Sequence, residues 1–223
     1  MSKAMIIMAK VPEPGTVKTR LNPYISPEQS AALSEALLKD SVERAGSITP
    51  NTFVAFTPKR LADKILRLLG NGQQTIFQKG VDLGERMSNA FEEAFALGFE
   101  RIVMTGTDSP TAPALAIEQS FDLLDGEARA VLGMARDGGF YLIGFDRFPG
   151  DVFNGIRWGG QHVFEHMKRN IESAGLNAAT VDTAIDIDRP DDLIEVAKTL
   201  RSNPELAPET ASWILENLPR AMD

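Results

Sequence analysis

The chain contains no cysteine, so it can form no disulfide bond, no thiolate metal site and no cysteine nucleophile. It also has no surplus of positive charge. With 23 Lys and Arg against 31 Asp and Glu, the formal net charge of -8 opposes binding to nucleic acid or to an anionic membrane surface. The N-terminal apolar run Ala4–Ala9 is too short for a membrane span or a signal-peptide core. We therefore expect a cytoplasmic protein that contacts neither nucleic acid nor membrane.

The rest of the composition is that of an ordinary globular protein. Hydrophobic residues make up 43% of the 223 residues and charged residues 24%, which predicts one domain spanning residues 1–223. Short runs rich in Ile, Val and Phe alternate with segments of helical period, and this alternation is typical of an α/β fold with helices on both faces of a sheet. The predicted strands begin at Ala4, Thr52, Gln74, Arg101, Arg129, Phe140 and Ala178.

One helix is marked at both ends by its sequence. Ser26 is a predicted N-cap, Pro27 occupies the first helical position, Gln29 completes a capping box, and Gly46 is the predicted terminator. Further helices are predicted over 59–70 and 85–98, and two closing helices lie within 190–219.

The direction of two strands follows from the length of their connection. The predicted strands 129–135 and 140–145 are separated only by "RDGG", which is too short for a parallel crossover. One of the two must therefore run antiparallel to the others. We predict a three-layer α/β/α domain with a mixed, mostly parallel sheet.

The loop after the first predicted strand, "AKVPEPGTVKTRLNP", is rich in proline and cations. Its single glycine is Gly15, and it matches neither a P-loop nor a dinucleotide-binding motif. Backbone amides therefore cannot surround a phosphate as they do in those loops, so charged side chains would have to bind it. Lys18 and Arg20 offer an ammonium and a guanidinium to phosphate oxygens. In an open α/β sheet, ligands bind beyond the carboxyl ends of the strands, and this position favours phosphate binding over a solvated basic turn.

Aspartates follow two later strands and form a candidate metal site. Asp108 comes directly after a buried strand, although it could also serve only to cap the next helix or turn. Asp186 and Asp188 lie two residues apart, on one side of an extended segment. Asp191 and Asp192 are better explained as favourable charges at a helix start. Because Mg²⁺ typically takes one or two carboxylates together with substrate phosphates, the Asp108 and Asp188 loops are predicted to meet over one metal ion.

Two other motifs have ordinary explanations. The segment "HVFEH" contains both histidines of the chain, His162 and His166, and matches the pattern of inverted zinc proteases. Zinc would need a third protein ligand on a matching helix, which the sequence lacks. We therefore interpret the two histidines as surface or interface residues. Gly138 and Gly139 allow a tight turn or a close approach to a ligand. Asp137 beside them could position an acceptor hydroxyl or merely close the turn.

Five ordered motifs together resemble a known family. They are "AKVPEPGTVKTRL", "QKGVDLGERM", "VMTGTDSP", "DGGFYLIG" and "DIDRPDDL". Their order and spacing, from Met5 to about Leu193, resemble the radical-SAM/selenodomain-associated transferases, also described as arsenosugar-biosynthesis glycosyltransferases. That family belongs with the nucleotide-diphospho-sugar transferases of the GT-A fold. It is also similar to the phospholactate guanylyltransferases and, more remotely, to the molybdenum-cofactor nucleotidyltransferases.

The resemblance implies a Mg²⁺- or Mn²⁺-dependent site with a role for several residues. Lys18 and Arg20 would contact the phosphates of the nucleotide. Asp108 would be the principal metal ligand, and Asp188 would provide a second carboxylate. Asp137 would lie near the sugar or the acceptor. Asp186 is predicted to join the metal ligands. The further substrate-binding positions expected are Gly15, Gln78, Gly84, Glu85, Arg86, Gly138 and Gly139.

Two departures from the family pattern bear on the substrate. The segment "GTDSP" has one aspartate where many GT-A glycosyltransferases have Asp-x-Asp. The segment "WGGQHV", Trp158 to Val163, stands where the family usually has Trp-Ser-Thr. If that Ser-Thr pair contacts the acceptor, this second departure predicts a different acceptor. The leading hypothesis is transfer of a sugar from a nucleotide sugar to a small acceptor. The alternative is nucleotidyl transfer from a nucleoside triphosphate to a phosphorylated acceptor with release of pyrophosphate. A nucleotide-binding module without turnover is a third hypothesis.

Overall fold

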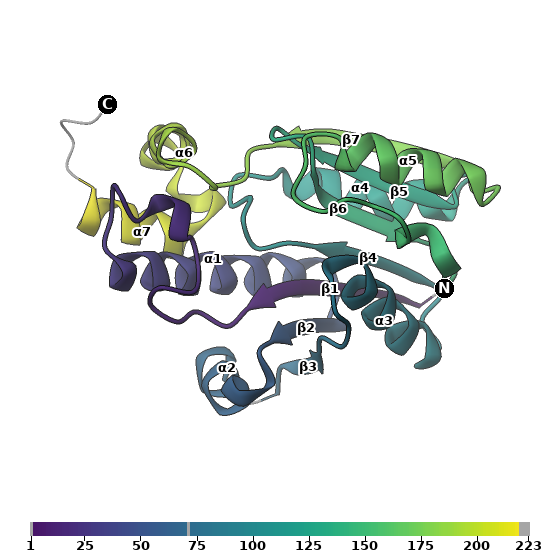
Figure 1. The fold of residues 1–223 in the computed structure, drawn as a ribbon, viewed down its shortest axis with the longest axis horizontal. Helices are drawn as coiled ribbons and strands as arrows, with labels where there is room; N and C mark the ends of the chain where they lie inside the picture. Colours follow the sequence, from purple (N-terminus) through teal and green to yellow (C-terminus); the bar gives the residue numbers. More distant parts are fainter. Residues whose placement is uncertain (1, 71, 219–223) are drawn as a thin grey trace.

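The computed structural model describes residues 2–70 and 72–218, which form a single α/β domain built on a seven-stranded sheet (Figure 1). All seven predicted strands are present, each within two residues of its expected ends. The strands are β1 (Lys3–Lys10), β2 (Thr52–Thr57), β3 (Gln74–Phe77), β4 (Arg101–Thr105), β5 (Ala130–Ala135), β6 (Phe140–Phe145) and β7 (Ala178–Ala184).

The helices connect these strands in the alternation that the sequence predicts. In the described residues, none of them has the length and apolar composition that a membrane span requires. The α-helices are α1 (Pro27–Ile48), α2 (Ala62–Leu69), α3 (Leu83–Ala96), α4 (Ala114–Asp125), α5 (Val163–Ser173), α6 (Pro190–Ser202) and α7 (Pro208–Asn217). Short 3-10 helices span Thr19–Leu21, Lys59–Leu61, Gly150–Phe153 and Pro204–Leu206.

The sheet has the strand order β3-β2-β1-β4-β6-β5-β7 and is mixed, as predicted. β1 pairs in parallel with β2 and β4, β2 with β3, and β5 with β7. β6 is antiparallel to both β4 and β5, because the four-residue connection after β5 permits only a hairpin. The carboxyl ends of β1, β4, β5 and β7 therefore face one edge of the sheet, and the chain leaves each of them there in a polar loop.

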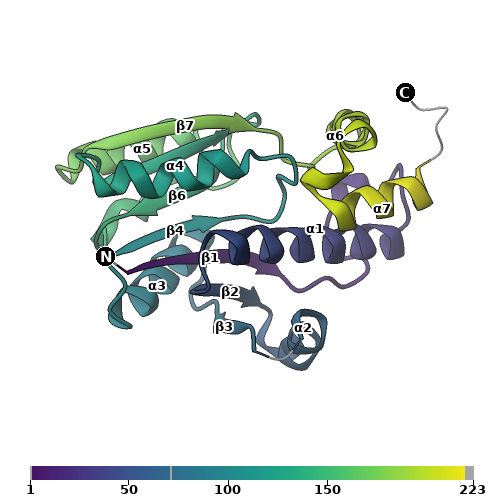
Figure 2. The ribbon, with the colours of Figure 1, turned by 180° about the vertical axis from the view of Figure 1, so that it is seen from behind.

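Alternate residues of the strands separate two apolar layers. One face packs against α3 and α5, for example through Phe91 and Met167, which lie against Ile6 and Ile143. The other face packs against α1, α2 and α4. Figure 1 views the sheet from the side of α3 and α5, and Figure 2 from the side of α1 and α4. The three-layer arrangement follows from the alternation of side chains in strands that are covered by helices on both sides.

Helix α1 has the predicted start but a later end. The Ser26 side chain accepts a hydrogen bond from the Gln29 amide, and the Gln29 side chain accepts one from the Ser26 amide, which is the predicted capping box. The prediction that Gly46 terminates the helix is wrong, since the helix continues to Ile48. Ala45 is fully buried against the sheet, and this packing outweighs the low helical propensity of glycine.

The closing helices α6 and α7 lie beyond the carboxyl ends of the strands and pack on the far side of α1 (Figure 1). The buried Asp40 links α1 to α7, because its carboxylate accepts hydrogen bonds from the Glu209 and Thr210 amides at the start of α7, at 3.0 and 2.8 Å. Pro219, the last residue of the predicted closing segment, lies outside the described residues. The packing of α6 fixes the loop that carries Asp186 and Asp188 at the edge of the sheet.

Candidate active site

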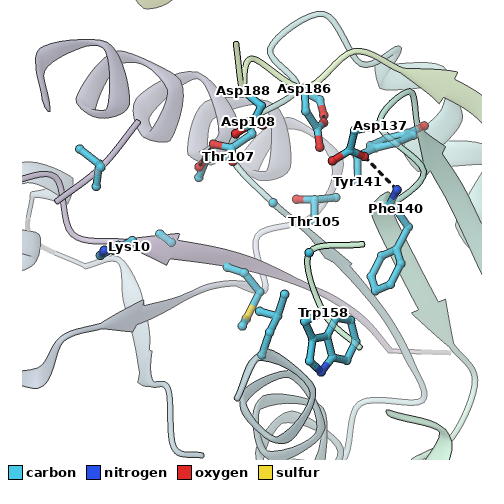
Figure 3. A pocket seen from close by; sticks show the side chains of 18 of the residues that line it. Lys10, Thr105, Thr107, Asp108, Asp137, Phe140, Tyr141, Trp158, Asp186 and Asp188 are labelled. Atoms are coloured by element: carbon cyan, nitrogen blue, oxygen red, sulfur yellow. Dashed lines mark hydrogen bonds between the residues drawn. The ribbon is translucent and has the colours of Figure 1, made fainter. Parts of the chain in front are cut away.

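A cavity of about 500 Å³ opens at the carboxyl edge of the sheet (Figure 3). Its walls come from the loop after β1, the loop after β4, the β5–β6 turn, the loop before α5, and the β7–α6 loop. The predicted residues that line it are Lys18, Arg20, Asp108, Asp137, Gly139, Asp186 and Asp188. The fold therefore gathers into one cavity the cations and carboxylates that the sequence separates by up to 170 residues.

Lys18 joins the loops after β4 and β7. Its Nζ atom lies 2.6 Å from Asp108 Oδ1 and donates a hydrogen bond of 2.6 Å to the Ile187 carbonyl oxygen. The side chain of Lys18 is only 9% exposed, and its backbone adopts the left-handed conformation with φ 49°. Such a conformation is unfavourable for a residue with a side chain and is typical of functional sites. The Ile187 amide also donates to the Asp108 carbonyl at 2.8 Å, so the two acidic loops do meet.

Arg20 forms a second ion pair at the rim of the cavity. Its Nη1 atom lies 2.5 Å from Asp188 Oδ2, and this hydrogen bond raises the pKa of the guanidinium. Both side chains are substantially exposed, so the pair contributes little to stability. Arg20 and Asp188 are thus available to a ligand that enters the cavity.

Asp186 is the carboxylate of the site with the most perturbed acidity. Its pKa is raised to about 6, chiefly because the side chain is removed from water and also because the Asp108 and Asp137 carboxylates lie nearby. A hydrogen bond from the Ser109 hydroxyl and the charge of Lys18 act in the opposite direction. A bound cation would stabilise negative charge on carboxylates that lie this close to one another.

Asp186→Asn is expected to change the pH dependence of stability in metal-free protein. Because the pKa of Asp186 is about 6 when folded and about 3.9 when unfolded, its ionisation costs the wild type stability as pH rises from 4 to 6, by about 2 to 3 kcal/mol. The variant should lack this loss. Urea unfolding in EDTA at pH 4 and pH 7.5 measures it, and a wild-type-minus-variant difference that is the same at both pH values would contradict the prediction.

Asp137 and Gly139 lie in the tight turn between β5 and β6. The Asp137 carboxylate accepts a hydrogen bond of 2.8 Å from the Gly139 amide and is exposed to the cavity. Gly138 between them does not line the cavity but has φ 90° and is pressed against the Gln161 backbone, where an added Cβ would lie 2.1 Å from the carbonyl oxygen. The Phe164 amide donates to the Gly138 carbonyl at 3.0 Å. Gly138 therefore fastens the loop before α5 to the turn of Asp137.

Gly138→Ala is expected to lower the free energy of unfolding by roughly 2 to 4 kcal/mol, because a strained φ adds to a steric clash with backbone. Gly155→Ala is a matched control, since Gly155 has φ 72° and open space around its Cα, so it should cost only about 1 kcal/mol. Chemical denaturation measures both variants. Equal losses would show that Gly138 is required only for its backbone conformation.

Two predicted substrate-binding residues lie elsewhere. The buried Gln78 donates from Nε2 to the Ala9 and Ala55 carbonyl oxygens, at 3.2 and 2.7 Å, and so ties together the ends of β1 and β2. It does not line the cavity, and neither does Gly15. The position of Gln78 indicates a structural contribution to the carboxyl edge of the sheet.

The first turn of α3 likewise supports the site from outside the cavity. Asp82 is the N-cap of this helix, and Gly84 packs against Trp158, where an added Cβ would lie 2.7 Å from the indole. Glu85 accepts a hydrogen bond from the backbone of the preceding loop, and Arg86 donates one to it, so both brace that loop. None of these four residues lines the cavity, although their neighbour Leu83 does.

Two residues that position the acidic loops are not among those predicted from the sequence. Ser109 donates its hydroxyl to Asp186. Arg44 of α1 donates to the Pro110, Ala112 and Ser109 carbonyl oxygens, at 2.7, 3.1 and 3.3 Å, and holds the loop that follows Asp108. The sequence does contain a sign that Arg44 is partly buried. Arg44 lies two helical turns after the buried Leu37 and therefore on the same face of α1.

The oxygen-rich donor set suits a hard divalent cation that also binds substrate phosphates. Within residues 2–70 and 72–218, no three His, Asp or Glu side chains converge tightly enough to hold a metal ion unaided. Asp108 and Asp186 provide carboxylates in the cavity, and Mg²⁺ commonly binds through one or two of these plus phosphate oxygens and water. His162 and His166 do not line the cavity.

Comparison with known proteins places this arrangement in a family. The family described as "Uncharacterized protein conserved in bacteria (DUF2064)" matches residues 40–160, more than half of the chain, including the loop of Asp108 and the turn of Asp137. The chain belongs to this family. A specific association with radical-SAM enzymes or arsenosugar biosynthesis stays a prediction.

Solved structures and a curated relative resemble this chain over most of their own length. A structure from Desulfovibrio desulfuricans G20, provisionally described as a nucleotide-diphospho-sugar transferase, has 32% identity and a TM-score of 0.91, covering 100% of this chain and 97% of its own. A 3-phospho-D-glycerate guanylyltransferase from Phenylobacterium zucineum is 28% identical over 81% of this chain and 84% of its own length. A cytidylyltransferase from Leptospira borgpetersenii shares the fold, with 17% identity, a TM-score of 0.57, and coverage of 93% of this chain and 97% of its own.

Proposed function

We propose that this chain is a metal-dependent glycosyltransferase that transfers a sugar from a nucleotide-diphospho-sugar to a small acceptor. The charge balance of the cavity is the observation that carries the proposal. Among the described residues that line it are three cations, Lys10, Lys18 and Arg20, and four aspartates. Two of these cations already pair with aspartates. Such a cavity can bind one diphosphate with the help of a divalent metal, but it offers few cations for a second phosphorylated substrate.

The side chains of the site would divide the work as follows. Lys18 and Arg20 would bind the diphosphate and stabilise the charge that develops on it as it leaves. Asp108, with Asp186 and Asp188, would hold Mg²⁺ or Mn²⁺, which supplies a Lewis acid for the leaving diphosphate. Asp137, exposed at the tip of its turn, would orient the acceptor hydroxyl and take its proton.

Nucleotidyl transfer is the second candidate, and the chemistry of the relatives favours it. The curated relative is named a guanylyltransferase, and "GTDSP" has a single aspartate, as in nucleotidyltransferases. In this reaction an acceptor phosphate oxygen would attack the α-phosphorus of a nucleoside triphosphate, and pyrophosphate would leave with the bonding electrons. The same cations and carboxylates would serve it.

The leaving group distinguishes the two reactions. The purified protein is incubated with Mg²⁺ or Mn²⁺ and with panels of sugar nucleotides and nucleoside triphosphates, together with candidate acceptors that include 3-phosphoglycerate. Acceptor-dependent release of nucleoside diphosphate supports glycosyl transfer, whereas release of pyrophosphate supports the second candidate. Thermal stabilisation by nucleotide without either product would favour a binding module that lacks turnover.

A further inference from the structure

We propose that Trp158, Phe140 and Leu83 form a subsite that binds an uncharged, ring-shaped acceptor by its apolar face. Together these three residues form the ring subsite. The proposal rests on the proposed glycosyl transfer and adds to it the chemical class of the acceptor. Figure 3 shows Trp158 at the opposite end of the cavity from Asp186 and Asp188, with Phe140 beside it.

The indole of Trp158 is held in place on two sides. Its ring lies edge-to-face with Phe140, with centroids 6.3 Å apart and an interplanar angle of 74°. Its other contact is the backbone of Gly84 in the first turn of α3, so closely that no side chain fits at that position. An aromatic ring that is ordered before ligand binding loses little entropy when a ligand stacks on it.

Apolar surface in this part of the cavity is left uncovered. Leu83 is 44% exposed, Trp158 and Phe140 are half-buried, and all three line the cavity. The Nε1 edge of the Trp158 indole faces Gly84, where an added Cβ would lie 3.0 Å from Nε1. Uncovered apolar surface inside a cavity is typical of a ligand pocket, in which burial of that surface gives affinity.

The ring subsite is fixed relative to the proposed base. Gly138, which follows Asp137, packs against the Gln161 backbone and accepts a hydrogen bond from the Phe164 amide. The loop that carries Trp158 is therefore fastened to the turn that carries Asp137. A ring stacked on Trp158 would be held at a constant position with respect to the Asp137 carboxylate, as transfer to one particular hydroxyl requires.

The cations that line the cavity do not come from the elements that carry the ring subsite. The lining cations Lys10, Lys18 and Arg20 all come from β1 and the loop that follows it, and none comes from α3, β6 or the Trp158 loop. An uncharged acceptor fits such surroundings.

In the reaction, the hydroxyl oxygen of the acceptor forms a bond to the anomeric carbon of the donor sugar. The bond from that carbon to the diphosphate breaks, the diphosphate leaves with the electron pair, and the hydroxyl proton passes to Asp137.

The two tryptophans of the chain make the ring subsite measurable by fluorescence. Trp213 of α7 is only 6% exposed, so acrylamide should quench mainly the fluorescence of Trp158. Phenyl β-D-glucoside and methyl β-D-glucoside serve as uncharged ring probes, and glucose 6-phosphate as the anionic one. The uncharged probes are expected to protect Trp158 from acrylamide at concentrations at least tenfold below those of the phosphate. A Trp213→Phe protein, in which only Trp158 emits, repeats the measurement without background.

Substitution separates the ring subsite from the nucleotide site. Trp158→Ala should weaken glucoside binding at least tenfold by calorimetry, while binding of Mg²⁺ with UDP and with GDP changes less than twofold. Phe148→Ala removes an exposed aromatic ring outside this cavity and is the matched control. If Trp158→Ala weakens nucleotide binding as much as glucoside binding, Trp158 stacks on the nucleobase and the proposal is wrong. Failure of both glucosides to protect Trp158 from acrylamide would also overturn it. Failure of the wild type to bind any nucleotide would overturn the proposed function instead.

Discussion

Asp108→Asn is expected to lower metal-dependent turnover between roughly 10² and 10³-fold, the usual cost of losing one electrostatic contributor to a transition state. The physical reason is that Asp108 follows a buried strand and points its carboxylate into the cavity beside Lys18 and Asp186. An amide keeps the shape of the side chain but supplies no negative charge to a divalent cation. Steady-state kinetics with Mn²⁺ and direct titration of Mn²⁺ by electron paramagnetic resonance measure both consequences.

The fold of this variant should be retained. The Asp108 side chain is 52% exposed, so its removal is expected to change the free energy of unfolding by less than about 1 kcal/mol. Asp182→Asn on β7 is the matched control, because this exposed carboxylate lies outside the cavity. Full activity of Asp108→Asn with unchanged Mn²⁺ affinity would refute the assignment of Asp108 to the metal.

Lys18→Ala is expected to change two affinities in opposite directions. Loss of the ammonium should weaken nucleotide binding by about 1.5 to 3 kcal/mol, or roughly 10- to 150-fold, which is the contribution of a charged hydrogen bond. In the ligand-free protein, however, the same ammonium lies 2.6 Å from Asp108 and occupies the electrostatic position that a metal ion would take. Its removal should therefore strengthen the binding of Mn²⁺ alone severalfold.

Calorimetric titrations with Mn²⁺ alone and with Mg²⁺ plus nucleotide separate these effects. Lys10→Ala is the matched control, since Lys10 also lines the cavity but donates its hydrogen bond to the Thr16 carbonyl oxygen and contacts no aspartate. It should leave the affinity for Mn²⁺ alone unchanged. If Lys18→Ala weakens Mn²⁺ binding as well, Lys18 supports the metal site rather than competing with it, and the proposed competition is wrong.

Local sequence patterns accounted for most of the fold. The strands were recognisable because their apolar runs are short, rich in β-branched and aromatic residues, and bounded by turn residues. The reversal of β6 followed from a connection too short for a crossover. The misplaced end of α1 shows the limit of such patterns, because the burial of Ala45 against the sheet is a long-range contact that no local rule contains.

The candidate site divides in the same way. Its charged residues were found from the sequence, since polar residues at the ends of buried strands in an α/β fold lie at one edge. Arg44, Ser109 and the packing of Gly84 on Trp158 were not found, because each acts through a partner more than 60 residues away in the chain.

The class of fold, the edge of the sheet that carries the site, and the cations and carboxylates at that edge were all predictable from the sequence. These depend on periodicity, chain connectivity and residue chemistry, all of which are local. Three other properties became visible only in the folded chain: Lys18 contacts Asp108, Asp186 is removed from water, and Trp158 lies beside Phe140 at the far end of the cavity. Those properties depend on distances and solvent exposure, which exist only once remote segments have packed together.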